Sequence, residues 1–288
     1  MKKIAVYGLG LAFEQYFDLI SYKYNIQVLV DGSFEKQGKY YHDILCVSPE
    51  AIPEYDIDAV LITPRWEQVQ TDISKHILEM LPNMKIIYMK DCFPKLYKED
   101  RIVAARDYID EYGNKILFEE GVSIHKIQVE FEGCNNKIFI GKNVHVANIL
   151  YIHCAGNDNV VEIGEGTSIV ATNIDVAEQG KVKIGSDCML SWDIDFFQNA
   201  NHPVFSLETG DRVNVPKDII VGDHVWIGKG VGLLAGADIG SGSVVGYRSV
   251  VSKKYPKNCT IVGSPAKVIR ENICWKRDAT GFYPIEHL

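Results

Sequence analysis

The stretch VGDHVWIGKGVGLLAGADIGSGSVVGYRSVV, residues 221–251, repeats with a period of six residues. Aliphatic residues begin the units, at Val221, Ile227, Leu233, Ile239, Val245 and Val251. Small or β-branched residues hold the fifth place of the units, and glycine follows most of the aliphatic positions. A unit of six makes one short strand and one turn, so three units make a triangular coil of about 18 residues. We therefore expect the aliphatic side chains to point into the coil.

The same repeat is looser upstream. The dipeptide Ile-Gly recurs at residues 140, 163 and 184, and these intervals of 23 and 21 residues predict coils with small insertions. The next interval, 37 residues from Ile184 to Val221, predicts about two coils and a loop extruded between about Asp193 and Lys217. We therefore predict a parallel β-helix over residues 115–270. A β-sandwich with glycine-rich turns is the alternative, although its strands would alternate with period two over longer runs.

Strands alternate with helices in the first part of the chain. Short apolar strands are expected at residues 4–7, 26–30, 58–63 and 85–89, with one helix after the GLGLAF segment and another over residues 66–81. This alternation predicts a parallel sheet, and so a Rossmann-like α/β domain over residues 1–98. Residues 99–114 have an amphipathic helical pattern ending near Gly113 and predict a linker helix. Residues 271–288 are expected to form a C-terminal tail.

Composition argues against several classes of protein. The net charge of −8 disfavours binding to nucleic acid or to anionic membranes. The apolar runs are shorter than the ~20 residues of a membrane span, and no signal-peptide cleavage site follows the N-terminal apolar run, so we expect a cytoplasmic protein. The seven cysteines are scattered, which argues against a disulfide framework. Neither they nor the histidines have metal-ligand spacing, so no metal is expected.

Three motifs near the end of the chain carry a resemblance to a known family. They are VWIG at residues 225–228, SVV at 249–251 with lysines after it, and GSPAKVIR at 263–270. With them, residues 218–272 resemble the C-terminal half of the hexapeptide-repeat acyltransferases, nearest to the maltose, galactoside and polysaccharide O-acetyltransferases. The resemblance implies a left-handed β-helix, a homotrimer, and acetyl-CoA bound as co-substrate in a groove between neighbouring β-helices.

The resemblance points to His202 as the catalytic residue. His202 lies in NANHPVF, inside the expected loop and 24 residues before Trp226, which is similar to the place of the catalytic histidine in galactoside-type relatives. A sugar hydroxyl does not ionise at pH 7, and a neutral imidazole accepts its proton as the oxygen attacks a thioester. An ordinary loop histidine before a proline is the alternative. Relatives often carry an aspartate where Ala200 stands here, so Asp193 or Asp195 would have to orient the ring.

Asn173 and Asp195 are the candidate residues for binding the acceptor. Asn173 lies about one coil before His202, near the position at which relatives use an asparagine to position the acceptor. A turn residue or a stacked asparagine ladder is the alternative for Asn173.

The candidates for coenzyme binding also follow from the resemblance. They are Trp226, Gly228, Gly246, Tyr247, Ser252, Lys253 and Arg270. The tryptophan would wall the groove, and the two glycines would let the pantetheine arm approach the backbone closely. Residues 251–277 carry seven basic residues and one acidic residue, a charge of +6 that suits the phosphates of the coenzyme. Simple corner geometry and a solvated charged turn are the alternatives.

The N-terminal domain leaves more than one function open. Gly8, Gly10 and Phe13 form an incomplete GxGxxG motif, and Asp31 ends the next strand, where it would suit a ribose diol. Such a domain binds a nucleotide-sugar in some relatives, or it serves for oligomerisation or docking. We expect O-acetylation of a sugar or nucleotide-sugar acceptor in surface polysaccharide or lipopolysaccharide biosynthesis. N-acetylation of a nucleotide-linked amino sugar and a non-catalytic β-helix scaffold are the alternatives.

Overall fold

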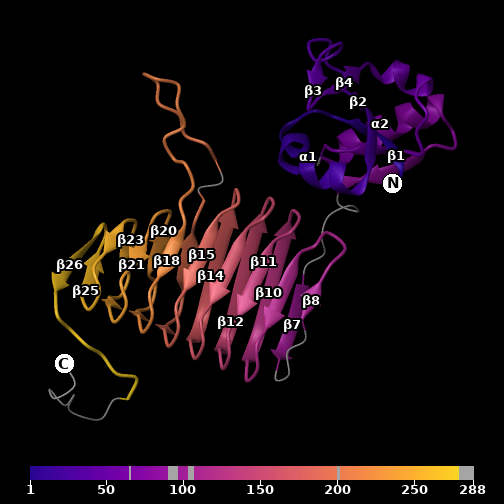
Figure 1. The fold of residues 1–288 in the computed structure, drawn as a ribbon. Helices are drawn as coiled ribbons and strands as arrows, with labels where there is room; N and C mark the ends of the chain where they lie inside the picture. The colour runs from indigo at the N-terminus through magenta and orange to yellow at the C-terminus, as the bar shows by residue number, and fades with distance from the viewer. Residues whose placement is uncertain (65, 90–96, 103–106, 200–201, 279–288) are drawn as a thin grey trace. The chain divides into compact units, whose positions relative to one another are not determined.

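The computed structural model describes residues 1–64, 66–89, 97–102, 107–199 and 202–278. The chain divides into two compact units. The N-terminal unit comprises Met1–Lys95 with Glu132–Cys134, and the C-terminal unit comprises Leu96–Phe131 with Asn135–Leu288. The α-helices lie in the N-terminal unit, whereas the C-terminal unit is built from strands (Figure 1).

A sheet runs through the N-terminal unit in the order β3-β4-β2-β1-β5-β6. Its strands are β1 (Lys3–Tyr7), β2 (Asn25–Val30), β3 (Tyr40–Tyr41), β4 (Ile44–Val47), β5 (Ala59–Ile62) and β6 (Lys85–Tyr88). The strands pair in parallel, except that β3 and β4 form an antiparallel hairpin. The helices are α1 (Leu11–Lys23), the 3-10 helix η1 (Pro49–Glu54) and α2 (Glu67–Met80).

The expected alternation of strands and helices, with its parallel sheet, is confirmed in this unit. The hairpin of β3 and β4 and the helix η1 were not expected, because each run is too short for a hydrophobic period to show in the sequence. Strand β5 is buried throughout, and β1 and β2 each contain three consecutive buried residues, so these strands form the centre of this unit.

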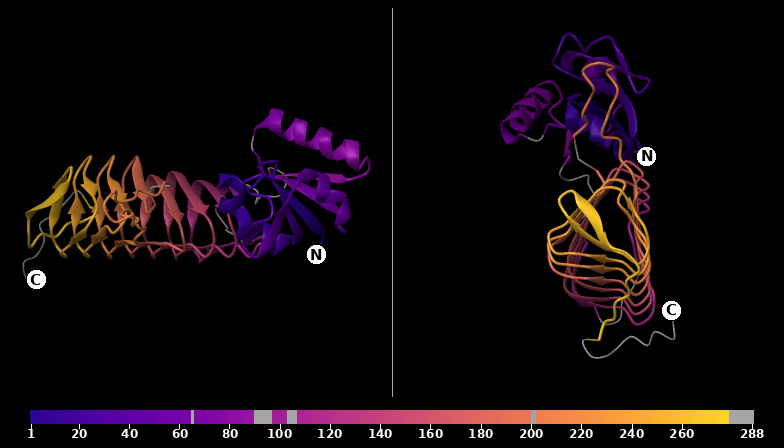
Figure 2. Two further views of the ribbon diagram at one scale, coloured as in Figure 1. Left: turned by 90° about the horizontal axis from the view of Figure 1, so that it is seen from above. Right: turned by 90° about the vertical axis from the view of Figure 1, so that its left-hand side faces the viewer.

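The coils of the C-terminal unit stack into a parallel β-helix. The right-hand view of Figure 2 looks down the axis of this β-helix from one end. One face runs through β8 (Tyr108–Ile109), β9 (Lys115–Phe118), β11 (Lys137–Ile140), β13 (Val160–Ile163), β15 (Lys181–Ile184), β18 (Ile219–Val221), β21 (Asp238–Ile239) and β24 (Lys254–Tyr255). Along this face the strands pair in parallel, except for β8 and β9. The expected stack of six-residue units is therefore confirmed.

The other two faces share long strands that turn a corner. The long strands are β10 (Ser123–Glu132), β12 (His145–Ala155) and β14 (Ser168–Ala177). From β14 onward one face continues through β16 (Met189–Leu190), β19 (Trp226–Ile227), β22 (Val244–Val245) and β25 (Thr260–Gly263). The other continues through β17 (Ile194–Phe197), β20 (Gly232–Leu234) and β23 (Val250–Val251). Strand β26 (Ala266–Arg270) folds back antiparallel on β25 and ends the stack.

The interior of the β-helix is the one that the six-residue period predicts. The six aliphatic positions between Val221 and Val251 are at most 1% exposed, and the fifth-place residues between Val225 and Ser249 are fully buried. Glycine is required where coils approach most closely. A Cβ atom on Gly164 would lie 2.5 Å from the carbonyl carbon of Gly185 in the next coil. Close backbone stacking, as well as the turn itself, therefore fixes glycine at this corner.

The interval from Ile184 to Val221 contains one coil and not the two that were expected. Ile184 is paired directly with Val221 in the parallel register of β15 and β18. The surplus residues leave the stack after β17 and return at β18, so they form a single long excursion. An extruded loop was correctly predicted, but a residue count alone does not divide an interval between coil and loop.

The expected linker helix over residues 99–114 is wrong for the described part of that range. Residues Tyr97–Ile102 form strand β7, which pairs antiparallel with β10, and β8 follows. Residues 103–106 lie outside the described part of the chain. An unpaired strand edge at the first coil offers backbone hydrogen bonds, and this tertiary pairing outweighs a modest local preference for helix.

A ladder of buried asparagines runs inside the first coils. The Nδ2 atom of Asn136 donates to Oδ1 of Asn114 at 2.9 Å, and the Nδ2 atom of Asn159 donates to Oδ1 of Asn136 at 2.9 Å. All three side chains are fully buried. Each amide thus satisfies its neighbour inside an apolar core, where an unpaired polar group would be costly.

No helix within the described residues is long and apolar enough to cross a bilayer. The described residues also contain no group of three or more His, Cys, Asp or Glu side chains placed to hold a metal ion.

The ladder gives a prediction about stability. Replacing Asn136 by Ala should lower the free energy of unfolding by about 3 kcal/mol, because it removes the acceptor of the buried backbone N–H of Asn159 and the donor to the carbonyl of Gly156. Chemical denaturation followed by far-ultraviolet circular dichroism measures the change. Asn148→Ala is the matched control, since Asn148 is exposed on β12. Equal stabilities of the two variants would show that the ladder contributes nothing beyond an ordinary surface asparagine.

Candidate active site

A pocket of about 290 Å³ opens on the face formed by β12, β14 and β17. Parallel pairing places Tyr151, Asn173 and Asp195 side by side on three successive coils. The Nδ2 atom of Asn173 donates to Oδ1 of Asp195 at 2.8 Å. The structure thus brings together the two residues expected to bind the acceptor. The other lining residues are Ile174, Asp175, Phe196 and Phe197.

A second polar pair lies beside the first on the same face. The Nδ1 atom of His153 faces Oδ2 of Asp175 at 3.4 Å, and both side chains are largely shielded from solvent. The Oδ1 atom of Asp175 is buried and has no hydrogen-bond partner among the described residues. Sequence reasoning gave His153 no role. The sequence did indicate this pair, because His153 and Asp175 are 22 residues apart. The same one-coil interval separates Asn173 from Asp195.

His202 lies on an arm that leaves the stack after β17. Residues 202–217 form this arm, in which Phe205 and Arg212 make an antiparallel bridge. The Nη1 and Nη2 atoms of Arg212 donate to the carboxylate of Glu178 at 2.7 and 2.9 Å, so the arm is anchored at the end of β14. His202 is exposed, and its backbone carbonyl accepts a hydrogen bond of 2.7 Å from Asn214. The arm has internal structure and presents the imidazole to solvent.

The two carboxylates expected to orient His202 have other partners. Asp195 accepts from Asn173, and Asp193 lies 3.4 Å from the ammonium nitrogen of Lys229. Ala200, where relatives often carry an aspartate, lies outside the described residues. Within the described residues, no hydrogen bond or ion pair joins His202 to either proposed orienting carboxylate.

The glycines proposed for the coenzyme groove have a structural explanation. A Cβ atom on Gly228 would lie 3.0 Å from the backbone nitrogen of Tyr247, and one on Gly246 would lie 2.5 Å from Cγ1 of Val262. A Cβ atom at either corner would crowd the neighbouring coil, so close stacking favours glycine at both. The side chain of Tyr247 is 61% exposed, and the guanidinium of Arg248 lies over its ring at 5.1 Å.

Two basic residues at this end of the chain form ion pairs, and Lys254 is exposed to solvent despite its pairing. Lys254 forms an ion pair with Asp238 at 2.7 Å, and Arg277 forms one with Asp187 at 2.7 Å. Ser252, Lys253 and Arg270 are exposed. The ammonium of Lys253 lies 5.7 Å from the centre of the Tyr255 ring. The cations that remain available at this end of the β-helix include the two that were proposed to contact phosphate.

The described part of the expected tail is residues 271–278, of which residues 273–278 dock against the β-helix; we call these six residues the C-terminal strap. The indole of Trp275 stacks on the imidazole of His224 at 4.1 Å, and its Nε1 atom donates to the carbonyl of His224 at 2.8 Å. The same indole lies 6.1 Å from that of Trp226, which is 40% exposed. His224 occupies a left-handed turn, with φ of 53°, and it also forms the platform for the strap.

Asp187 joins the strap to the turn that carries His224. One carboxylate oxygen faces Nδ1 of His224 at 2.6 Å, and the other accepts from Nε of Arg277 at 2.7 Å. Arg277 also donates to the Ser168 hydroxyl and to the Cys188 carbonyl. Burial by itself would raise the pKa of Asp187, but the hydrogen bonds from His224 and Arg277 outweigh burial and hold the pKa below its ordinary value.

Asp31, proposed for a ribose diol, is engaged within its own unit. Its carboxylate accepts from the backbone nitrogens of Leu9 and Ser33 at 2.8 and 2.9 Å, and from the ammonium of Lys36 at 2.9 Å. Burial opposes ionisation of Asp31, but these donors hold its pKa below the ordinary value. A ribose would have to displace them. This arrangement favours a structural role for Asp31 in holding the loop that contains Gly8.

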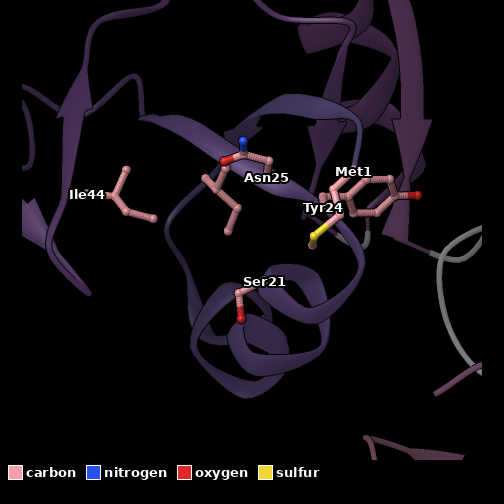
Figure 3. Close-up of a pocket in the computed structure, with 6 residues that line it drawn as sticks. Met1, Ser21, Tyr24, Asn25 and Ile44 are labelled. Carbon is pink, nitrogen blue, oxygen red and sulfur yellow. The ribbon is translucent and has the colours of Figure 1, made fainter. Parts of the chain in front are cut away.

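The N-terminal unit also has an open hollow between the end of α1 and the start of β2 (Figure 3). Its lining includes Met1, Ser21, Tyr24, Asn25 and Ile44. The hollow lies at the amino ends of β1 and β2, whereas ligands of open α/β sheets bind beyond the carboxyl ends of the strands. It is therefore not the place at which a nucleotide site would be expected.

Known proteins resemble both parts of the chain. The C2185-like N-terminal family model matches residues 1–87, and the bacterial transferase hexapeptide model (six repeats) matches residues 218–253. The polysialic acid O-acetyltransferase of Neisseria meningitidis is 36% identical over 165 residues, which are 57% of this chain and 76% of that protein. The galactoside O-acetyltransferase of Escherichia coli K12 is 30% identical over 165 residues, 55% of this chain and 77% of that protein.

Among solved structures, a polysialic acid O-acetyltransferase matches at 30% identity with a TM-score of 0.44, covering 62% of this chain and 90% of that one.

The C-terminal strap gives a prediction about pH. Because its pKa is lowered in the folded chain, Asp187 stabilises the docked strap above about pH 4 and loses this effect as the pH falls through the folded-state value. Arg277→Ala removes one donor, so undocking should begin at higher pH than in the wild type. Acrylamide quenching of Trp275, taken as the difference from Trp275→Phe in each background, measures the docking. Lys257→Ala is the control, and identical profiles for all three proteins would contradict the role of Arg277.

Proposed function

The chain belongs to the hexapeptide-repeat acetyltransferases, and we propose that it transfers the acetyl group of acetyl-CoA to a sugar hydroxyl. The observation that carries this proposal is the hydrogen-bonded pair of Asn173 and Asp195, which lines a pocket beside the strand from which the His202 arm leaves. The names of the relatives, which include polysialic acid and galactoside O-acetyltransferases, support a saccharide acceptor. We place the reaction in surface polysaccharide or lipopolysaccharide biosynthesis.

The proposed chemistry is direct transfer with His202 as the general base. The neutral imidazole takes the proton of the acceptor hydroxyl as its oxygen attacks the thioester carbonyl carbon. The carbon–sulfur bond then breaks, and the coenzyme thiolate leaves and is protonated by the imidazolium. Asn173 and Asp195 hold the acceptor, and backbone N–H groups beside the groove stabilise the developing oxyanion. No covalent enzyme intermediate is needed.

The coenzyme is proposed to lie along the last coils. Trp226 walls the groove, and the backbone at Gly228, Gly246 and Tyr247 lies under the pantetheine arm. Lys253 and Arg270, with Ser252, contact the phosphates. The assignment of Ser252, Lys253 and Arg270 as phosphate contacts is supported by the exposure of these residues and by the ion pairs that Lys254 and Arg277 already form nearby.

The arm also supports a homotrimer in which each active site uses two subunits. It exposes apolar side chains that a free surface does not favour. They are Val204, Phe205, Leu207, Val213 and Val215, between 52% and 105% exposed. A neighbouring β-helix would cover this surface and supply the orienting partner that His202 lacks within the described residues of its own chain. We also propose that the coils of the β-helix wind in a left-handed sense.

The N-terminal unit fits the proposed Rossmann-like fold, with the strand order β4-β2-β1-β5-β6 and helices between strands. N-acetylation of a nucleotide-linked amino sugar is not supported by this unit, because the carboxylate of Asp31 is already engaged by Leu9, Ser33 and Lys36. We propose oligomerisation or docking as its function.

Acetyl transfer is tested by titrating the thiol released from acetyl-CoA with a panel of sugars as acceptors. We expect slow background without acceptor and turnover with a hexose or hexosamine derivative. His202→Ala should reduce kcat by at least ~10², the usual contribution of a general base. His145→Ala, at an exposed position of β12, is the control. A reduction of only twofold for His202→Ala would remove this residue from the mechanism.

Self-association is tested by sedimentation velocity at micromolar concentration. The wild type should sediment as a trimer. Leu207→Asp places a charge on the apolar arm and should weaken the association at least ~10-fold, because a charge cannot be buried unpaired at an interface. Thr209→Asp puts the same charge on an exposed polar position of the arm and should leave the trimer intact. A monomeric wild type, or equal effects of the two variants, would contradict the proposed interface.

A further inference from the structure

The pocket on β12, β14 and β17 has an unusual balance of charge for a saccharide site. Its polar groups are the Tyr151 phenol, the Asn173 amide, and the carboxylates of Asp175 and Asp195. The neighbouring side chain of His153 points to Asp175 at 3.4 Å. The lining thus offers hydrogen-bond acceptors and negative charge, and its charged members are both acidic.

One of these acceptors lacks a partner. The Oδ1 atom of Asp175 is buried and has no hydrogen-bond partner among the described residues, although the residue lines the pocket. A buried carboxylate oxygen is costly unless a donor reaches it. A sugar hydroxyl or an amino-sugar N–H group is a donor of the right kind. A ligand carboxylate is not, because it would bring a third negative charge into the pocket.

Size and shape agree with a single sugar ring. The cavity of about 290 Å³ is at the lower end of the usual range for small-ligand sites. Tyr151 lies beside Asn173 and Phe197 lies beside Asp175 on paired strands, so an aromatic side chain flanks each of these polar residues of β14. Aromatic side chains offer apolar area to the C–H face of a sugar, while the polar pair fixes its hydroxyls.

We propose that this pocket selects a non-acidic sugar, a hexose or hexosamine, and rejects sugars that carry a carboxylate. This inference rests on the proposed function, since it names the class of acceptor for the same site. It separates the chain from relatives that are named for polysialic acid, a polymer of acidic sugars. Asp175 and Asp195 are the residues that set this specificity, by accepting hydrogen bonds from the acceptor and by repelling anions.

The test compares acceptors that differ in charge and otherwise little. Thiol release from acetyl-CoA is measured with methyl hexosides, methyl N-acetylhexosaminides and methyl sialosides. Methyl hexuronates and the corresponding hexuronamides of the gluco, galacto and manno series are then measured as acceptors and as competing ligands. We expect kcat/KM for the best non-acidic sugar to exceed that for sialosides at least ~10-fold, and each amide to bind roughly tenfold more tightly than its acid.

Three variants locate the effect. Asp175→Asn and Asp195→Asn keep the shape of the side chain and remove one negative charge, so each should reduce the preference for amide over acid several-fold. Asp158→Asn removes the same charge from an exposed turn outside the pocket and should leave the preference unchanged. Thermal unfolding confirms that each variant is folded.

The outcomes separate this inference from the proposed function. Sialosides used as fast as hexosides, or acids binding as tightly as amides, would overturn the acceptor class while leaving acetyl transfer in place. An unchanged preference in both Asp175→Asn and Asp195→Asn would remove these residues as its cause. No release of thiol with any sugar would overturn the proposed function, and the acceptor assignment with it.

Discussion

The close stacking of backbone on backbone along the β-helix is the constraint on which the rest of the structure depends. Each coil must meet the next in parallel register, as Ile184 meets Val221, and a Cβ atom at a corner such as Gly164 would clash with the coil below. Aliphatic residues fill the interior, and the asparagine ladder satisfies the buried polar groups of the first coils. Because the register is fixed, side chains one coil apart become fixed neighbours on the outer faces.

The fixed register brings together polar side chains that are one coil apart in the sequence. Asn173 and Asp195 are joined by it, as are His153 and Asp175, so a single face carries two polar pairs and a pocket. Insertions are tolerated where they leave the register intact. The arm with His202 departs after β17 and the chain rejoins the stack at β18, so the residue that we propose as general base lies outside the core without disturbing it. The arm exposes apolar side chains, and this surface is the one at which we propose contact with another subunit.

Charge is distributed unevenly over the β-helix. The pocket face is acidic, whereas exposed cations gather near the last coils, where Lys254 and Arg277 are already paired and Lys253 faces solvent. A polyphosphate ligand and a non-acidic acceptor suit these two regions respectively. The C-terminal strap contacts Asp187 and Ser168 through Arg277, and through Trp275 it lies beside Trp226, the proposed wall of the coenzyme groove.

The six-residue period by itself determined the β-helix, its buried positions and its close-packed corners, because each unit must present an aliphatic side chain inward at the same phase. The alternation of strands and helices likewise determined the parallel sheet of the N-terminal unit. The sequence alone did not show how many residues before Val221 belong to the coil and how many to the arm. It also did not show that residues 97–102 pair as a strand. Both features depend on which backbone partners are available. The docking of Trp275 on His224 was also decided only in three dimensions, whereas the one-coil interval of 22 residues already indicated the pairing of His153 with Asp175. Contacts across coils and between distant segments follow from register and packing, which no local pattern encodes.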